Sequence, residues 1–388
     1  MISPNRRAPW RRTALLFIGH LLNDGYAAFF APLLPLLIDR LGLSLALAGA
    51  LGTAMILTNS LLQPGLGHLV DRAQRPFLVV VGPLMTVTAM SLIGRVASFE
   101  LLLVVMFVAG AGTALFHPAA AALVGAQDHP RRGLLMAFFS SGGTIGGALA
   151  PLVIVAYVQA ASLAATPWLL LPGATLVAAF ALPLRSHLPP VRTTGARAPG
   201  IRLPRSLVLL WIVIVLRSVA GTSFASFLAV LVTERGGSPL MGGAAISVFL
   251  LCGAAGGFAA GALSDRIGRK TVILGSLLLA TPCLLGMLWV SAIGLLPVVA
   301  VAGVFTLSST PVGVVTAQES LPGRTALVSG LFMGTAWGVG GLALTPVGWL
   351  ADRFGLPPVL SVVAVLPLVA ALLMIFFRHA PVISPPPR

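Results

Sequence analysis

Long apolar runs separated by short charged loops constrain most strongly how this chain can fold. Hydrophobic residues make up 57% of the 388 residues and charged residues only 9%, whereas soluble domains carry about a quarter charged residues. A run of about 20 apolar residues crosses a bilayer as a helix. The runs here are continuous and do not alternate with polar residues, which excludes a membrane β-barrel. The sequence therefore predicts an all-α polytopic membrane protein.

Twelve such runs can be placed, and they predict twelve transmembrane helices. The expected spans are 13–38, 44–69, 76–95, 99–124, 133–160, 166–184, 207–233, 240–262, 271–290, 294–318, 325–350 and 356–377. Residues 185–206 contain five arginines and four prolines, a composition that cannot form a span. We expect an N-terminal six-helix bundle at 1–184, a cytoplasmic linker at 185–206 and a C-terminal six-helix bundle at 207–388.

The basic residues are distributed unevenly between the two ends of these spans. Nineteen of the 24 lie on the side of the N-terminus and the linker, and four lie on the other side. Because basic loops stay in the cytoplasm, the asymmetry predicts a multi-pass inner (plasma) membrane protein with both termini cytoplasmic. It also accounts for the net charge of +15 without a nucleic-acid partner.

A charged turn occurs twice, half a chain apart. The stretch from Gly261 to Lys270 places Asp-Arg four residues after a glycine, and the stretch from Gly67 to Pro76 repeats the arrangement 194 residues earlier, with Gln74 and Pro76 as departures. The repetition predicts two structural copies of one plan. The residues of these loops that carry the pattern are Gly67, Asp71, Arg72, Arg75, Gly261, Asp265, Arg266, Gly268, Arg269 and Lys270.

The pattern Gly-x-x-x-Asp-Arg-x-Gly-Arg-Lys resembles the loop signature of the major facilitator superfamily, found after helices 2 and 8. The resemblance implies two pseudo-symmetric six-helix bundles, with spans 1, 4, 7 and 10 around a central cavity. It also implies that the two charged loops act as gates that hold the bundles together in the outward-open state. The simpler alternative is that these basic loops only orient the chain in the membrane.

Span 1 contains three polar residues at a depth where charges are costly. His20 and Asp24 share a helix face because they are four residues apart, and Asn23 lies beside them. A carboxylate removed from water is easier to protonate, and histidine can relay a proton. We therefore predict a proton-coupling site at Asp24 and His20. The alternative is a pair whose members only satisfy each other inside the bundle.

Two further polar residues fall inside spans. Arg217 lies about ten residues into span 7, and because its charge is permanent it needs a partner. That partner is Asp24, an anionic substrate or a fixed structural ion pair. His117 lies in span 4 directly before Pro118, and it either faces substrate or packs between helices. The superfamily resemblance implies that His117 and Arg217 share a cavity with His20 and Asp24, so Asn23, His117 and Arg217 are expected to bind substrate.

Three segments resemble the fosmidomycin-resistance type of superfamily efflux protein. They are residues 20–25 with Leu34-Pro35, residues 112–120, and the glycine-rich run 140–147. The resemblance implies proton-driven export of a small anionic drug by alternating access. Two alternatives remain: a proton-coupled uptake symporter for a small organic anion, and a membrane sensor that transports nothing.

Several other functions are not supported by the sequence. Acidic residues are few and no nucleophile–base or metal-ligand spacing occurs, so we expect neither an enzyme nor a metal site. No cofactor is expected, and Cys252 and Cys283 lie inside apolar spans as small packing residues. Asn59 and Gln63 share a face of span 2 and are expected to hydrogen-bond between helices. The expected partners are a small-molecule substrate, protons and the lipid bilayer, and because nothing in the sequence requires an oligomer, we expect a monomer.

Overall fold

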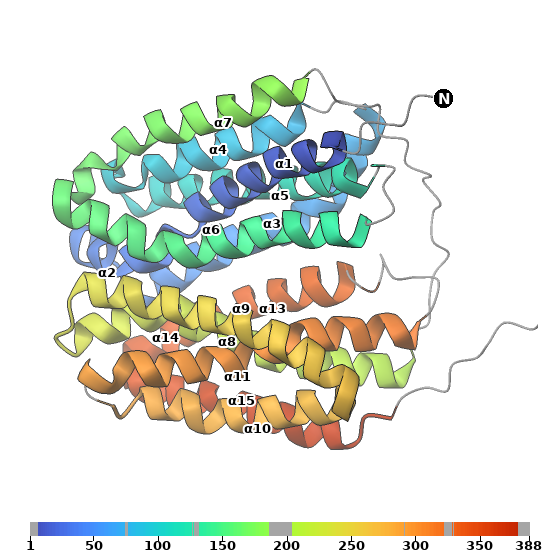
Figure 1. The fold of residues 1–388 in the computed structure, drawn as a ribbon. Helices are drawn as coiled ribbons and strands as arrows, with labels where there is room; N and C mark the ends of the chain where they lie inside the picture. Colours follow the sequence, from blue (N-terminus) through green and yellow to red (C-terminus); the bar gives the residue numbers. More distant parts are fainter. Residues whose placement is uncertain are drawn as a thin grey trace, which may run out of the picture. The chain divides into compact units, whose positions relative to one another are not determined.

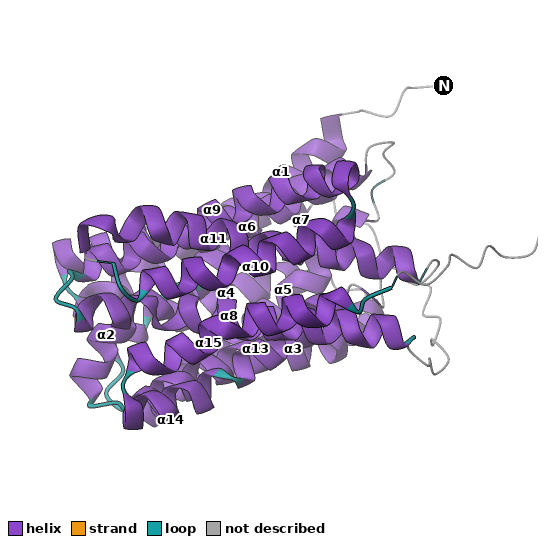
Figure 2. Ribbon diagram, turned by 90° about the horizontal axis from the view of Figure 1, so that it is seen from below, coloured by secondary structure: helices purple, strands orange, loops and turns teal. Residues whose placement is uncertain are grey.

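A computed structural model describes residues 7–73, 77–125, 127, 132–185, 204–290, 292–321, 328 and 330–378, with only the backbone described for 7–8, 64–73, 132–133, 185, 292–293, 330 and 333. All regular structure in these residues is helical (Figure 2). The elements are α1 Arg7–Ala27, α2 Phe30–Leu41, α3 Leu45–Ala73, α4 Leu78–Ser91, η1 Ile93–Arg95, α5 Phe99–Gly125, α6 Arg132–Ala161, η2 Leu163–Leu169, α7 Leu170–Arg185, α8 Arg205–Glu234, α9 Pro239–Ile267, α10 Arg269–Met287, α11 Ala292–Ser320, η3 Gly330–Thr335, α13 Ala336–Leu342, α14 Leu344–Phe354 and α15 Leu356–Ile375.

The number of spans agrees with the sequence prediction. Eleven stretches of the described chain are long and apolar enough to cross a membrane, with α1 and α2 counted together as Pro9–Leu41. The twelfth span is formed by the shorter consecutive elements η3, α13 and α14, in the region where a span was expected at 325–350. The protein is therefore an all-α, multi-pass membrane protein with twelve spans.

The first span is broken, which the sequence analysis did not predict. We expected one helix over 13–38, but α1 ends at Ala27 and α2 begins at Phe30. Pro32 explains the break, because its ring excludes a helical carbonyl four residues earlier, at Ala28. The last turn of α1 is closed by hydrogen bonds from Ala28 N to the carbonyl oxygens of Asp24 and Gly25, at 3.0 and 3.2 Å.

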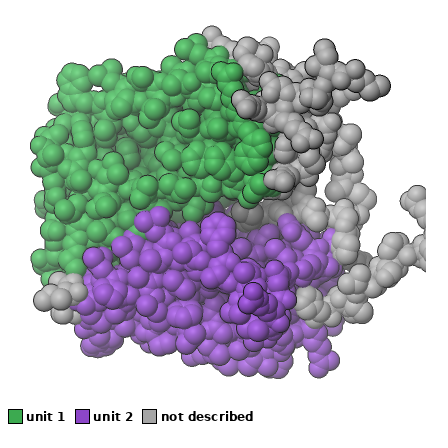
Figure 3. Space-filling model, viewed as in Figure 1, with its two compact units in different colours: residues 1–195, 226–247, 344–353 green, residues 196–225, 248–343, 354–388 purple. Residues whose placement is uncertain are grey.

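The described chain divides into two compact units, which are described separately here (Figure 3). Unit 1 contains residues 1–195, 226–247 and 344–353, and unit 2 contains residues 196–225, 248–343 and 354–388. In unit 1, α1 packs on α6, and α5 packs on both α3 and α4. In unit 2, α10 packs on α11 and α15. Long helices run side by side within each unit (Figure 1).

Four helices end at a glycine in the left-handed region, which closes the helix without the strain a side chain would add. These are Gly42 (φ 60°), Gly236 (φ 77°), Gly268 (φ 93°) and Gly355 (φ 84°). Each follows an acidic residue and an arginine by one or two positions, as in Asp39-Arg40-Leu-Gly42. The acidic-Arg pair therefore marks the end of a span, and the next helix begins within a few residues.

Candidate functional site

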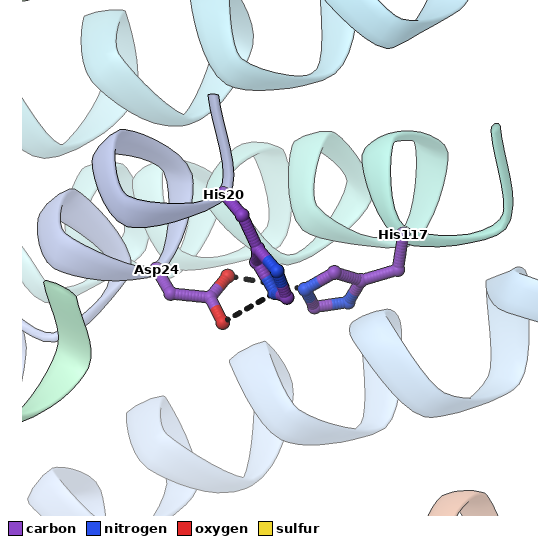
Figure 4. A group of neighbouring side chains, drawn as sticks. All are labelled: His20, Asp24 and His117. Carbon is purple, nitrogen blue, oxygen red and sulfur yellow. Dashed lines mark hydrogen bonds and ion pairs between the residues drawn. The ribbon is translucent and has the colours of Figure 1, made fainter. Parts of the chain in front are cut away.

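Asp24 is the centre of a polar cluster inside unit 1 (Figure 4). Its Oδ2 lies 3.2 Å from Nε2 of His20 and its Oδ1 lies 3.1 Å from Nε2 of His117. Oδ1 also accepts a 2.9 Å hydrogen bond from the Asn23 amide. Both carboxylate oxygens of Asp24 thus face ring nitrogens from two different helices.

The two histidines lie on helices that are far apart in the sequence but meet in the fold. His20 is one turn before Asp24 on α1. Both residues lie near the end of that helix, which stops at Ala27. His117 lies in α5 directly before Pro118, 93 residues from Asp24. The imidazole rings of His20 and His117 meet edge to face, with centroids 5.0 Å apart.

The hydrogen bonds assign the protons in this cluster. Nδ1 of His20 lies 3.0 Å from the carbonyl oxygen of Phe139, which can only accept, so this nitrogen carries a hydrogen. A neutral His20 then presents a lone pair at Nε2, directly opposite Asp24 Oδ2. Two lone pairs at 3.2 Å repel, so the His20–Asp24 contact requires one additional proton, held by either residue.

His117 has the opposite arrangement. Its Nδ1 faces the amide nitrogen of Gln63 at 3.5 Å, and that amide nitrogen is a donor because it also bonds Asn59 Oδ1 at 2.9 Å. Nδ1 of His117 therefore accepts, and Nε2 carries the hydrogen that is donated to Asp24. The His117–Asp24 contact forms with a neutral ring and an ionised carboxylate. Asn59 and Gln63, expected to bond between helices, bond each other on α3, and Gln63 alone reaches α5.

Buried hydroxyls that the sequence analysis missed hold Asn23. Asn23 is fully buried; its Oδ1 accepts a 3.0 Å hydrogen bond from Thr86 of α4, and its Nδ2 lies 3.5 Å from Thr113 of α5. Thr113 donates to the Ala109 carbonyl at 3.0 Å, and the Thr86 oxygen lies 3.3 Å from the same carbonyl oxygen. Asn23 therefore points into the bundle and orients the Asp24 carboxylate. A threonine inside an apolar span was the available signal.

Glycines of α6 allow the cluster to lie against that helix. A Cβ at Gly143 would collide with His20 Nε2 and Asp24 Oδ2, and a Cβ at Gly146 would collide with the Leu21 backbone. The His20 ring also stacks on Phe139 of α6, with centroids 4.5 Å apart. The glycine-rich run thus brings α6 onto α1 where the polar residues lie. Gly143 was not among the predicted site residues.

Two histidines and a carboxylate also match the donor types that bind divalent transition metals. One ligand atom from each of His20, Asp24 and His117 lies within 4.8 Å of the others. The Asp24 oxygens, however, already face both imidazoles at hydrogen-bond distance. A metal ion would have to replace both contacts, so the arrangement fits a shared proton better than a metal.

Arg217 lies in unit 2 and is almost fully buried on α8. Its Nε has no hydrogen-bond partner among the described residues, and the same holds for the hydroxyls of Thr306 and Ser309 on α11. A Cβ at Gly221 would lie 3.6 Å from Arg217 Nη1 and 3.5 Å from Thr306 Cγ2. The guanidinium therefore extends along α8 next to α11. Asp24 lies in unit 1 and Arg217 in unit 2, so a shared cavity for the two residues stays a prediction.

The charged loop at 261–270 makes its described contacts inside unit 2. Arg269 bridges Asp265 and Glu319, at 2.5 and 3.1 Å. Lys270 Nζ donates to the carbonyls of Ile375 and Phe377, at 2.6 and 2.8 Å. These contacts join α9, α10, α11 and the end of α15.

The first charged loop is only partly described. Gly67, Asp71 and Arg72 lie in the last turns of α3, where only the backbone is described, and Arg75 lies outside the described residues. The predicted linker 185–206 also lies largely outside them, since residues 186–203 are not described.

Twelve apolar spans that contain buried and partly buried polar residues, among them a carboxylate, are typical of a membrane transport protein. A family model for the Major Facilitator Superfamily matches residues 16–345. The chain belongs to this superfamily. It is a transporter and not an enzyme, in agreement with the sequence prediction.

Curated relatives and solved structures agree with this assignment. The chain is 29% identical over 366 residues to the fosmidomycin resistance protein of Escherichia coli (strain K12), covering 92% of this chain and 90% of that protein. It is also 29% identical over 381 residues to the uncharacterized MFS-type transporter YfnC of Bacillus subtilis (strain 168), covering 92% and 91%.

The fold matches transporters of known structure. A bacterial homologue of the human lysosomal transporter Spinster, solved in an inward-facing and occupied conformation, superposes with a TM-score of 0.81 at 17% identity over 97% of both chains. The nucleoside transporter NupG superposes with a TM-score of 0.76 at 15% identity, over 95% of this chain and 99% of that chain. The predicted major facilitator fold is therefore confirmed.

Proposed function

We propose that this protein exports a small anionic drug-like molecule across the inner membrane by alternating access, in exchange for protons. Both termini are cytoplasmic, and the six-helix bundles at 1–184 and 207–388 are the moving bodies. Asp24 takes up the proton together with His20, Asn23 orients the Asp24 carboxylate from inside the bundle, and His117 and Arg217 face the substrate. The charged loops at 67–76 and 261–270 close the cytoplasmic side in the outward-open state. The relative named for fosmidomycin resistance supports export and an anionic substrate.

The proposal of proton coupling rests on one observation. His20 Nε2 and Asp24 Oδ2 lie 3.2 Å apart, and this contact is attractive only when one of the two atoms carries a proton. Loss of that proton turns an attraction into a repulsion between two lone pairs. The pair lies inside the first span, where an isolated charge is expensive. Protonation and deprotonation of this pair therefore change which conformation of the helix bundle is favoured.

Arg217 supports an anionic substrate. A buried guanidinium is permanently charged and needs a counter-anion, and its Nε has none among the described residues. The hydroxyls of Thr306 and Ser309 on the neighbouring helix also have no partner there. A carboxylate, phosphate or phosphonate would satisfy the guanidinium and such hydroxyls together.

The decisive experiment measures proton movement in inverted membrane vesicles with a pH-sensitive dye. We expect an anionic drug, with fosmidomycin as the first compound, to release protons from energised vesicles containing the wild-type protein. Asp24→Asn keeps the shape of the side chain but cannot titrate, so no release is expected. Asp39→Asn is the matched control, because Asp39 is exposed at the end of α2.

Two outcomes would contradict the proposal. Proton-driven accumulation that survives in Asp24→Asn would remove the proton role from this residue. Proton movement in the opposite direction, with substrate entering the cell, would establish the uptake symporter instead. Adding a chelator to the wild-type assay separates proton coupling from a metal effect, since only a bound metal would make activity depend on it.

A further inference from the structure

The sequence contains a third copy of the charged pattern, and this copy lies at the end of span 11. Residues 348–355 place Asp352-Arg353 four residues after Gly348 and end at Gly355, as residues 261–268 do. The second copy closes α9, whereas this one closes α14. Because consecutive spans alternate in direction, α9 in span 8 and α14 in span 11 end on opposite sides of the membrane.

The carboxylate of this third copy binds the beginning of another helix. Its two oxygens accept hydrogen bonds from the backbone amides of Leu45 and Ala46, at 2.7 and 2.9 Å. These amides belong to the first turn of α3, where backbone donors have no partner within the helix. Asp352 lies 307 residues from Leu45 in sequence, yet it caps α3 with both charge and hydrogen bonds.

The neighbouring arginine does not neutralise this carboxylate. The guanidinium of Arg353 lies over the ring of Trp349, 3.9 Å from its centroid. The described hydrogen bonds of Asp352 are therefore those that it accepts from the α3 amides. Asp352 is exposed, and so is Asp39 in Asp39-Arg40-Leu-Gly42, the corresponding turn at the end of α2.

Glycines bring the two helix backbones into direct contact beside this cap. A Cβ at Gly348 would collide with the Leu45 carbonyl, and a Cβ at Gly49 would collide with the Leu344 carbonyl. Further along α3, the hydroxyl oxygens of Thr53 and Thr345 are 2.9 Å apart. We call this contact of α3 with α14, from Leu45 to Thr53 and from Leu344 to Asp352, the α3–α14 seam.

A second contact of the same kind lies in unit 1. A Cβ at Gly243 of α9 would lie 2.7 Å from the Pro151 carbonyl of α6, and Ser247 Oγ accepts a 3.1 Å hydrogen bond from Leu152 N. This contact also joins a span from the first half of the sequence to a span from the second half. Both contacts lie toward the outer loops of the twelve-span topology, away from the linker.

We propose that residues 348–355 form a latch that closes the outer side of the transporter by capping α3. The proposal rests on the alternating access and the orientation proposed above. The outer side opens only when the α3–α14 seam parts, and the charge of Asp352 on the α3 amides opposes that opening. The gating pattern is thus used on the outer side as well as the cytoplasmic side, and here it binds a helix N-terminus.

Accessibility of the seam tests the role of the charge without any substrate. A Thr53→Cys reporter in a Cys252→Ser, Cys283→Ser background is labelled with an impermeant maleimide in right-side-out vesicles. Asp352→Asn keeps the size of the side chain, and we expect it to raise the labelling rate about twofold to fivefold, the range for losing one exposed charge at a helix N-terminus. Asp39→Asn, which alters the sister turn, should label like the parent. Equal rates in Asp352→Asn and the parent would overturn the latch.

A disulfide across the seam tests whether it must open. The 2.9 Å separation of the hydroxyl oxygens suits a Thr53→Cys, Thr345→Cys pair in the same background, which mild oxidant should cross-link. We expect transport to stop on oxidation and to return on reduction. Full transport by the cross-linked protein would show that the seam stays closed during the cycle, which would reject the proposal. The labelling measurement needs neither a substrate nor proton coupling, so failure of the Asp24 role would not be confused with failure of the latch.

Discussion

The two histidines that contact Asp24 are chemically different. His20 gives its Nδ1 hydrogen to the Phe139 carbonyl, so its contact with the carboxylate depends on an extra proton. His117 accepts at Nδ1 from Gln63 and donates from Nε2 as a neutral ring. In the proposed exchange, the proton therefore belongs to the His20–Asp24 pair, and His117 orients the carboxylate.

Glutamine substitutions distinguish these two roles. A glutamine amide can donate to Asp24 from either position but cannot titrate near neutral pH. We expect His20→Gln to change the pH dependence of proton-coupled transport. His117→Gln should keep the wild-type pH profile, with a change of about threefold or less in rate. Transport rates measured from pH 5.5 to 8.5 check this, and identical profiles for the two variants would contradict the assignment of protons.

In the proposed mechanism, Arg217 binds the negative charge of the substrate. We expect Arg217→Gln to raise the half-saturating concentration of an anionic substrate about tenfold or more, the loss expected for a hydrogen bond to a charged group. A neutral ester of the same compound serves as the control, because it has no charge for the guanidinium to bind. An equal effect on the ester and the anion would indicate that Arg217 only supports the fold of unit 2.

Sequence reasoning reached these side chains unevenly. The His20–Asp24 contact follows from helical spacing, so it could be predicted from a single helix. His117 was expected near Asp24 only through the family resemblance, and the structure places it 3.1 Å away. The partners of Asn23 could not be predicted, because Thr86 and Thr113 come from other helices and nothing in their own segments specifies a neighbour.

At the level of elements, three neighbouring glycines of α6 face different kinds of atoms. Gly143 faces the ends of the His20 and Asp24 side chains, Gly146 faces the Leu21 backbone, and a Cβ at Gly147 would meet only the Asp24 carbonyl at 4.0 Å. Side-chain ends can move aside, whereas backbone cannot. One helix therefore offers three substitutions of the same kind with three different consequences.

Alanine at these three positions makes the comparison. Gly143→Ala should fold normally but lose most proton-coupled transport, because the methyl group displaces the His20–Asp24 contact. Gly146→Ala should lower thermal stability, because α6 must move away from α1. Gly147→Ala should keep activity and gain up to about 1 kcal/mol from better helix propensity. Melting temperature and transport are measured together, and full transport in Gly143→Ala would contradict the tight arrangement.

Element boundaries show where sequence patterns are insufficient. Apolar runs located all twelve spans, because burial in lipid requires length and hydropathy and little else. The break between α1 and α2 was missed although Pro32 stands within the run, because a proline is tolerated in many transmembrane helices. Span 11 was also expected to be one helix, yet it consists of η3, α13 and α14.

For the whole molecule, the fold was predictable because duplication, charge asymmetry and span count all indicate the same architecture. The charged pattern was recognised at 67–76 and 261–270, where the family resemblance directs attention. The copy at 348–355 is equally visible in the sequence, but its role emerges only from its contact with α3. The sequence of a motif at a helix end does not identify the helix that it contacts.

The π-helical turn of η3 has a consequence for this architecture. The element η3, Gly330–Thr335, is a π-helix, and a π turn holds one residue more than an α turn, so span 11 carries a surplus residue before α13 and α14. If that residue were absorbed into regular helix, everything beyond it would rotate by about 100°. Gly348 and Asp352 would then leave the surface of α3 together. The surplus residue in η3 therefore determines which face of α14, the one with Gly348 and Asp352, lies against α3.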